Sequence, residues 1–175
     1  MSLISRIFGK RTDSRAAVRP LWHCIVEIAR DKPWYAQCGV ADTVAGRFDA
    51  ITLVLALVML RMERDKTADD TLIAPSARLT ELFVEDMDGQ LRQSGVGDLV
   101  VGKHIGKLVS VMGGRIGALK EALPQGDTAL IAALERNVTL IEGADTARLA
   151  AQVRQLYAQI DTLSNEDLLA ARIAR

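Results

Sequence analysis

Four carboxylates crowd one short stretch of the chain, where they could in principle bind a metal ion: Glu81, Glu85, Asp86 and Asp88. On a helix with about 100° per residue they do not share a face, because Asp86 points into the apolar side while Glu85 points away from it. A dinuclear metal site in a helix bundle also needs a Glu-x-x-His motif, which the sequence lacks. We therefore expect no metal and no cofactor.

The other residue types that commonly do chemistry are isolated. The chain has two histidines, His23 and His104, and two cysteines, Cys24 and Cys38. The cysteine spacing matches no zinc motif, so we expect reduced thiols in or near the core. The histidines are expected in the core or at an interface, and haem ligation by one of them has no support elsewhere in the sequence. Phosphate-binding loops, nucleophile elbows and His-Glu-x-x-His motifs are absent, which predicts a protein that is not an enzyme.

Length and composition favour one globular domain without a strong electrostatic field. The chain has 175 residues, and its 22 basic residues balance its 22 acidic ones. Neutral charge and 4% aromatic content argue against specific nucleic-acid binding. The longest apolar stretch, Ile51–Leu60, is shorter than the ~20 residues that span a bilayer. We expect a cytoplasmic protein, with peripheral contact at the inner membrane as an open alternative.

Hydrophobic periodicity predicts an all-α, single-domain bundle of six to eight helices. Residues 1–19 form a basic, amphipathic N-terminal tail with five arginines and lysines against one acid. The tail could contact a ribosome, lie on an anionic membrane surface or simply be loose. Residues 20–175 form the helical domain. Proline and capping signals predict helix starts at Pro20, Asp42 or Thr43, Pro75, Asp98, Asp127, Asp145 and Ser164.

Two segments interrupt this helical pattern with glycine and charge, Gly39–Asp49 and Leu82–Lys103. Because Asp86 falls on an apolar face, its carboxylate needs a partner. We predict a structural ion pair between Arg47 and Asp86. The alternative is that Asp86 makes a polar contact with another protein.

The helix expected over 98–123 carries a face of small residues opposite its apolar stripe. Such a face lets helix backbones approach closely, and four glycines cost about 3–4 kcal/mol of helix propensity. We therefore predict a close-packed helix there, either from this chain or from a partner. The glycines are Gly102, Gly106, Gly113 and Gly117.

An ordered set of short motifs resembles the ubiquinol-cytochrome c chaperone family, which includes the assembly factor for cytochrome b of the bc1 complex. The similarity covers about residues 20–123. The family usually has aromatic residues before its Gly-Arg pair, where this chain has Val111-Met112-Gly113. The motifs here are Trp34-Tyr35, Asp42-Thr43, Gly46-Arg47-Phe48-Asp49, Phe83, Asp86-Met87-Asp88, Leu91-Arg92, Gly95-Val96-Gly97-Asp98 with Lys103, and Gly114-Arg115.

The resemblance implies a bacterial, non-catalytic chaperone of bc1 assembly that binds newly made cytochrome b, or another bc1 subunit, near the membrane. A helical ligand-binding protein for haem, quinone or lipid, with His104 and Arg115 in its pocket, is the alternative. A third hypothesis is a scaffold in which both segments only hold the fold. On the chaperone hypothesis, the partner-binding residues are Arg47, Asp49, Asp88, Arg92, Lys103, His104 and Arg115.

Overall fold

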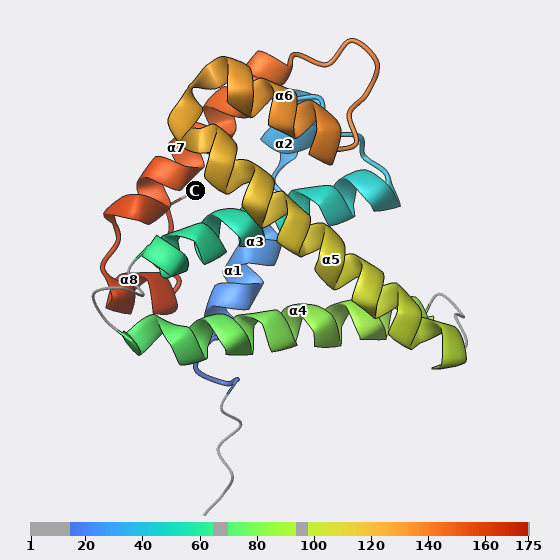
Figure 1. Ribbon diagram of the computed structural model, residues 1–175, viewed down its shortest axis with the longest axis vertical. Helices are drawn as coiled ribbons and strands as arrows, with labels where there is room; N and C mark the ends of the chain where they lie inside the picture. The colour runs from blue at the N-terminus through green and yellow to red at the C-terminus, as the bar shows by residue number, and fades with distance from the viewer. Residues whose placement is uncertain (1–14, 65–69, 94–97, 175) are drawn as a thin grey trace, which may run out of the picture.

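The computed structural model describes residues 15–64, 70–93 and 98–174, without the side chains of residues 70, 91 and 98–104. These residues form eight α-helices, which confirms the predicted all-α bundle (Figure 1). In chain order the elements are α1 (Arg19–Ala29), α2 (Lys32–Ala36), α3 (Val44–Arg64), η3 (Asp70–Leu72), α4 (Ile73–Gln93), α5 (Asp98–Ala122), η4 (Leu123–Gln125), α6 (Asp127–Asn137), α7 (Thr146–Thr162) and α8 (Asn165–Leu169).

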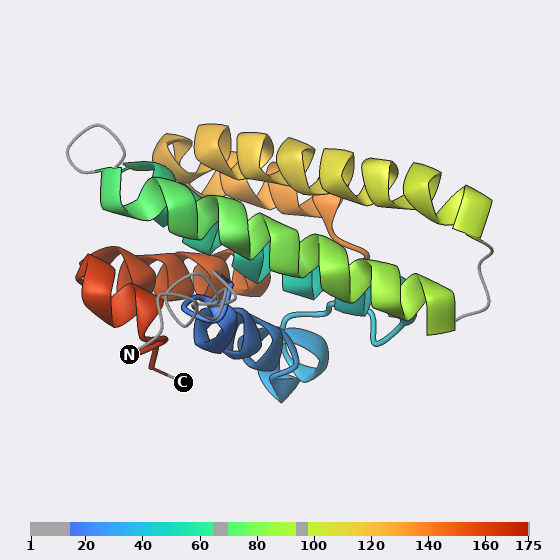
Figure 2. The same cartoon turned by 90° about the horizontal axis from the view of Figure 1, so that it is seen from below.

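Helix α3 is the central element of the bundle. It is apolar nearly all round from Ala50 to Leu60, and every residue of that stretch except Met59 is buried. It packs against α1, α4, α5 and α7. Figure 2 shows the long helices α4 and α5 running side by side, while α6 and α7 pack together farther along the chain. A helix without a polar face can only be stable in such surroundings.

Local capping signals located most helix starts correctly. Thr43 Oγ1 accepts a hydrogen bond from the Gly46 amide at 3.2 Å at the start of α3. Asp145 accepts from the Arg148 amide at 3.1 Å, and Ser164 accepts from the Asp167 amide at 3.0 Å. Each of these contacts satisfies an amide that the first helical turn leaves without a partner.

Pro33 and Pro75 each lie in the first turn of a helix, and α4 begins slightly before the predicted start at Pro75. Helix α1 ends at Ala29, before Pro33, and Pro33 lies in the first turn of α2. Helix α4 begins at Ile73, two residues before Pro75. Proline is tolerated in a first turn because its missing N–H has no helical partner there.

A short extended contact joins two segments that lie about 100 residues apart in the sequence. Val40 and Leu140 form an isolated antiparallel bridge. Next to it, the Ala41 amide donates to the Thr139 carbonyl at 2.9 Å, and the Ile141 amide donates to Gly39 at 2.9 Å. The segment before α3 is thereby held against the segment after α6.

Within the described residues, no helix is both long enough and apolar enough to cross a membrane.

Cys24 and Cys38 are free and buried, which confirms the prediction made for both thiols.

Gly46→Ala should destabilise the fold, because a Cβ at this position would overlap the carbonyl oxygen of Ala41. Overpacking of this kind costs about 1–3 kcal/mol. Gly117→Ala is the matched control, since the space beside Gly117 is open and alanine favours a helix by about 1 kcal/mol. Urea unfolding should separate the two variants, and equal stability would contradict the close approach.

Candidate partner-binding groove

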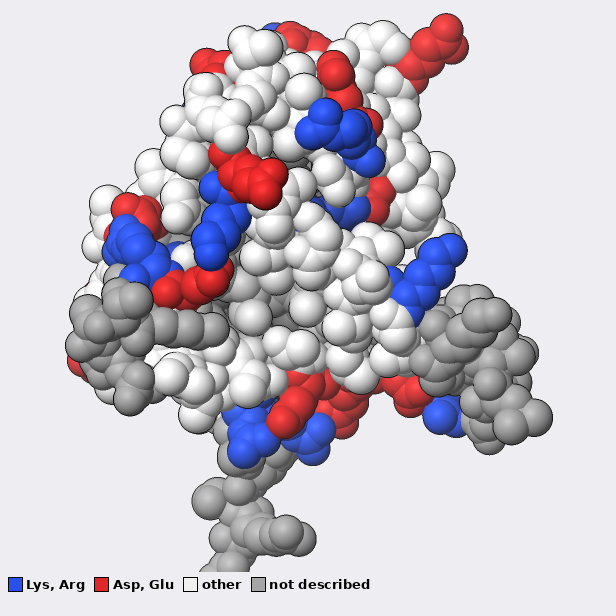
Figure 3. Space-filling view, in the orientation of Figure 1, with Lys and Arg blue, Asp and Glu red and all other residues white. Residues whose placement is uncertain are grey.

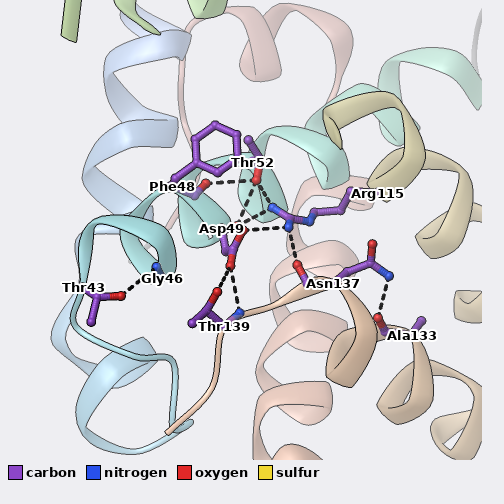
Figure 4. Close-up of polar contacts among 9 residues, drawn as sticks. All are labelled: Thr43, Gly46, Phe48, Asp49, Thr52, Arg115, Ala133, Asn137 and Thr139. Carbon is purple, nitrogen blue, oxygen red and sulfur yellow. Dashed lines mark hydrogen bonds and ion pairs between the residues drawn. The ribbon is translucent and has the colours of Figure 1, made fainter. Parts of the chain in front are cut away.

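A buried ion pair ties α3 to α5. The Arg115 guanidinium donates to Asp49 Oδ1 at 2.8 Å, and the two side chains are 3% and 12% exposed. The same guanidinium donates to the Asp49 carbonyl at 3.1 Å and also to the Thr52 hydroxyl and the Asn137 carbonyl. Figure 4 shows these groups converging from α3, α5 and the end of α6.

The second carboxylate oxygen of Asp49 holds the segment after α6. Oδ2 accepts from the Thr139 amide at 2.8 Å and from the Thr139 hydroxyl at 2.6 Å (Figure 4). Both oxygens of this carboxylate are therefore satisfied inside the protein. A buried charge persists only when it is paired and hydrogen-bonded in this way.

The predicted ion pair between Arg47 and Asp86 is wrong. Arg47 pairs with Asp42 at 2.7 Å on the surface, and its guanidinium lies 5.7 Å from the centre of the Tyr35 ring. Asp86 is half-buried and accepts from Gln90 at 3.4 Å. The buried pair of the bundle is Asp49 with Arg115 because Asp49, and not Arg47, lies on the inward side of α3.

The partner-binding prediction is also wrong for Asp49 and Arg115, whose side chains are enclosed by the fold. Asp88 and Arg92 pair with each other at 2.8 Å along α4, with Arg92 exposed. The side chains of Lys103 and His104 lie outside the described residues. Of the seven predicted partner-binding residues, Arg47, Asp88 and Arg92 are therefore described on the surface.

No helix of the described chain packs on the small-residue face of α5. Gly106, Gly113 and Gly117 are exposed, and a Cβ on any of them would meet nothing within 4 Å. The prediction of an internal packed helix is wrong for these three glycines; Gly102 lies among the residues whose side-chain surroundings are not described. The opposite side of α5, with Met112 and Leu119, is the side buried in the bundle.

A groove of about 730 Å³ opens between the start of α3, the last turns of α4 and the middle of α5, with residues from the end of α1 and from α2 at its edge. Aromatic, aliphatic and methionine side chains supply most of its wall, while two arginines and one glutamine supply its polar groups. Its lining residues are Arg30, Tyr35, Val44, Ala45, Arg47, Phe48, Ile51, Met87, Gln90 and Leu108.

Sequence reasoning found part of this groove and missed the rest. Arg47 was a predicted partner-binding residue, and Tyr35, Phe48 and Met87 belong to the family-like motifs. Val44 was missed, although it is 89% exposed and begins α3. An apolar residue next to a capping threonine gives no sequence signal that it faces solvent.

The groove provides apolar contact and positive charge, and its lining includes no carboxylate among the described residues. Burial raises the pKa of the Tyr35 hydroxyl, against the opposing effect of Arg47. The hydrogen bond that the Arg47 guanidinium donates to the Asp42 carboxylate raises the pKa of Arg47. Tyr35 therefore stays neutral and Arg47 stays charged at physiological pH.

Charged groups lie mainly toward the edges of the face shown in Figure 3, and the middle, over α5 and α3, is largely uncharged. Burial raises the pKa of the Cys38 thiol. A protonated thiol is a poor nucleophile, so Cys38 is a core residue and not a reactive one.

The sequence from residue 36 to residue 175 matches the family model of the ubiquinol-cytochrome C chaperones. The chain belongs to this family. The matched range includes α6, α7 and α8, which lie beyond the resemblance over residues 20–123. The C-terminal helices are therefore part of the family's fold.

A solved structure supports the same assignment. The crystal structure of the Cbp3 homolog from Brucella abortus is similar to this chain at 34% sequence identity and a TM-score of 0.79. The similarity covers 98% of this chain and 96% of that one. No curated protein matches the chain.

Asp49→Ala should cost about 3–5 kcal/mol of stability, because it leaves the Arg115 charge buried without its counter-ion. The control is Asp42→Ala, which removes the exposed partner of Arg47 and should cost about 1 kcal/mol or less. Thermal and urea unfolding measure both effects. Similar losses in the two variants would show that the Asp49 pair has no special role in the fold.

Proposed function

We propose that this protein is a non-catalytic assembly chaperone of the cytochrome bc1 complex, and that it binds newly made cytochrome b in the groove beside α3. Family membership supports the role in bc1 assembly. One observation carries the location: Tyr35, Arg47, Phe48 and Met87 come from three separate family-like motifs and line the same groove. Met87 is 4% exposed and forms part of the buried floor, whereas Tyr35 and Phe48 are partly exposed and Arg47 is exposed.

The chemistry of the groove suits a membrane-protein client. Segments that will span a bilayer are apolar, and their surface must be shielded from water until they insert. A hydrophobic groove between helices can accept the apolar face of another helix through side chains spaced three and four residues apart. The open glycine face of α5 lies on the same helix as Leu108 and offers such a client a surface of close backbone approach.

No observation favours the alternative of a haem- or quinone-binding pocket built on Arg115. Its guanidinium is engaged by Asp49, Thr52 and Asn137.

The role of residues 1–19 at a ribosome or an anionic membrane stays a prediction, since residues 1–14 lie outside the described part of the chain. Arg15, the first described residue, pairs with Glu85 of α4 at 2.9 Å.

Val44→Glu should reduce the amount of cytochrome b that copurifies with the protein from membranes of a bc1-containing bacterium by about tenfold, a loss of about 1.4 kcal/mol. The fold should be unaffected, because Val44 is 89% exposed and a first-turn glutamate suits a helix N-terminus. Quantitative mass spectrometry of the purified complexes measures the loss.

Ile141→Glu is the matched control, since Ile141 is also apolar and 52% exposed but does not line the groove. Its cytochrome b recovery should equal that of the unchanged protein. Equal recovery from both variants would place the client elsewhere, and no recovery from the unchanged protein would contradict the chaperone function itself.

A further inference from the structure

The two arginines of the groove differ in their electrostatic state. The charge of Arg47 is compensated by an ion pair with Asp42 at 2.7 Å, and its guanidinium lies over the Tyr35 ring. The Tyr35 hydroxyl in turn donates to the Ala29 carbonyl at 2.6 Å, which fixes the ring. Arg47 is therefore a structural part of the rim whose charge is already compensated.

Arg30 has no such compensation. It is the residue immediately after α1, its side chain is exposed, and the described structure contains no ion pair or hydrogen bond of its guanidinium. It lines the groove and also the neighbouring polar pocket, which contains the carboxylates of Glu85 and Asp86 without a described ion pair from Arg30 to either. The groove consequently carries at its edge one positive charge without a direct ion pair in the described structure, and its own lining includes no carboxylate.

An apolar occupant would cover part of the surface around Arg30 and remove water from the guanidinium. Taking a charge out of water is costly unless the partner supplies an opposite charge. An occupant with a carboxylate near this edge offsets the desolvation free energy of Arg30 by forming an ion pair. A neutral occupant leaves that cost in place, and a cationic one is also repelled by the guanidinium. The charge of Arg30 therefore discriminates between otherwise similar apolar segments.

The apolar lining also indicates the width of the occupant. It extends from Ile51 at the buried floor, 7% exposed, to Val44 at the rim, 89% exposed. A single acyl chain on the floor would leave the rim in water, while a helix about 10 Å across contacts both. The wall is itself built from several helices, as in other grooves that accept a helix.

We propose that the groove accepts an apolar helical segment that carries an acidic side chain or a terminal carboxylate, and that Arg30 pairs with this carboxylate. The proposal rests on the proposed function, because it specifies which kind of client segment the chaperone recognises. Arg30 is then a specificity-determining residue, while Phe48, Ile51, Met87 and Leu108 supply affinity that does not depend on charge.

The test measures binding of the full-length protein to fluorescein-labelled amphipathic peptides by fluorescence anisotropy. The peptides share one leucine-rich face and differ at a single boundary position, which is Glu, Gln or Lys, and that position is moved along the peptide in a series. The unchanged protein should bind the best Glu peptide about tenfold more tightly than its Gln counterpart and the Lys peptide most weakly. Arg30→Gln should abolish the preference and tighten binding of the Gln peptide, because the charged guanidinium no longer has to be desolvated, and Arg30→Glu should favour the Lys peptide.

Arg136→Gln is the matched control, because Arg136 of α6 is likewise exposed and likewise has no side-chain partner in the described structure. It should keep the full preference for glutamate. Equal affinity for the Glu and Gln peptides at every position, or a preference that survives in Arg30→Gln, would overturn the proposal. Dodecanoate that binds the groove through Arg30, with no peptide binding, would overturn it in favour of a lipid ligand.

The outcome is separable from that of the proposed function. If cytochrome b copurifies with the unchanged protein while the peptides show no charge preference, only the role of Arg30 fails. If the preference is present but cytochrome b is not recovered, the recognition rule stands for a different client.

Discussion

The pair between Asp49 and Arg115 connects three parts of the chain that no other buried charge in the described structure brings together. It joins the second turn of α3 to α5, and through Asn137 and Thr139 it also holds the end of α6. Burying two charges is expensive, and the cost is offset only because the carboxylate has its full set of donors. The relative position of α3 and α5 is therefore fixed tightly at this point.

The shape of the groove depends on this fixed position of α3 relative to α5. Phe48 and Ile51 flank Asp49 along α3, and Leu108 lies two turns before Arg115 on α5. A shift of α3 relative to α5 would widen or close the space between these side chains. The buried pair itself is enclosed and does not contact a client. It nevertheless sets the spacing between the apolar side chains of α3 and α5, and a client can bind only if that spacing is wide enough. The exposed pair of Arg47 with Asp42 has the complementary role of shaping the rim.

The sequence predicted the helices well because their signals are local. Thr43, Asp145 and Ser164 act on amides three residues away, so no knowledge of the packing is needed to place them. The fold class follows from the same periodicity. The family resemblance added the functional assignment, which periodicity alone does not contain.

The ion pair could not be assigned in the same way, because pairing depends on how helices pack. Helix α3 is apolar nearly all round, so its hydrophobic pattern does not show whether Arg47 or Asp49 faces inward. The presence of Arg115 within an apolar stripe was the available signal, and it pointed to Asp49 only once α5 was known to lie against α3. The prediction of a helix packed on the glycines of α5 failed for a related reason. A face of small residues permits close packing but does not require it.

The most direct test of the central claim is photo-crosslinking in a bacterium that assembles bc1, with p-benzoylphenylalanine placed at position 44, 111 or 141. All three side chains are exposed and apolar, so the replacements should preserve the fold. The account predicts that newly made cytochrome b is crosslinked from position 44 and not from position 141, with position 111 reporting on contact with the open face of α5. Crosslinks from position 141 without any from position 44 would contradict it.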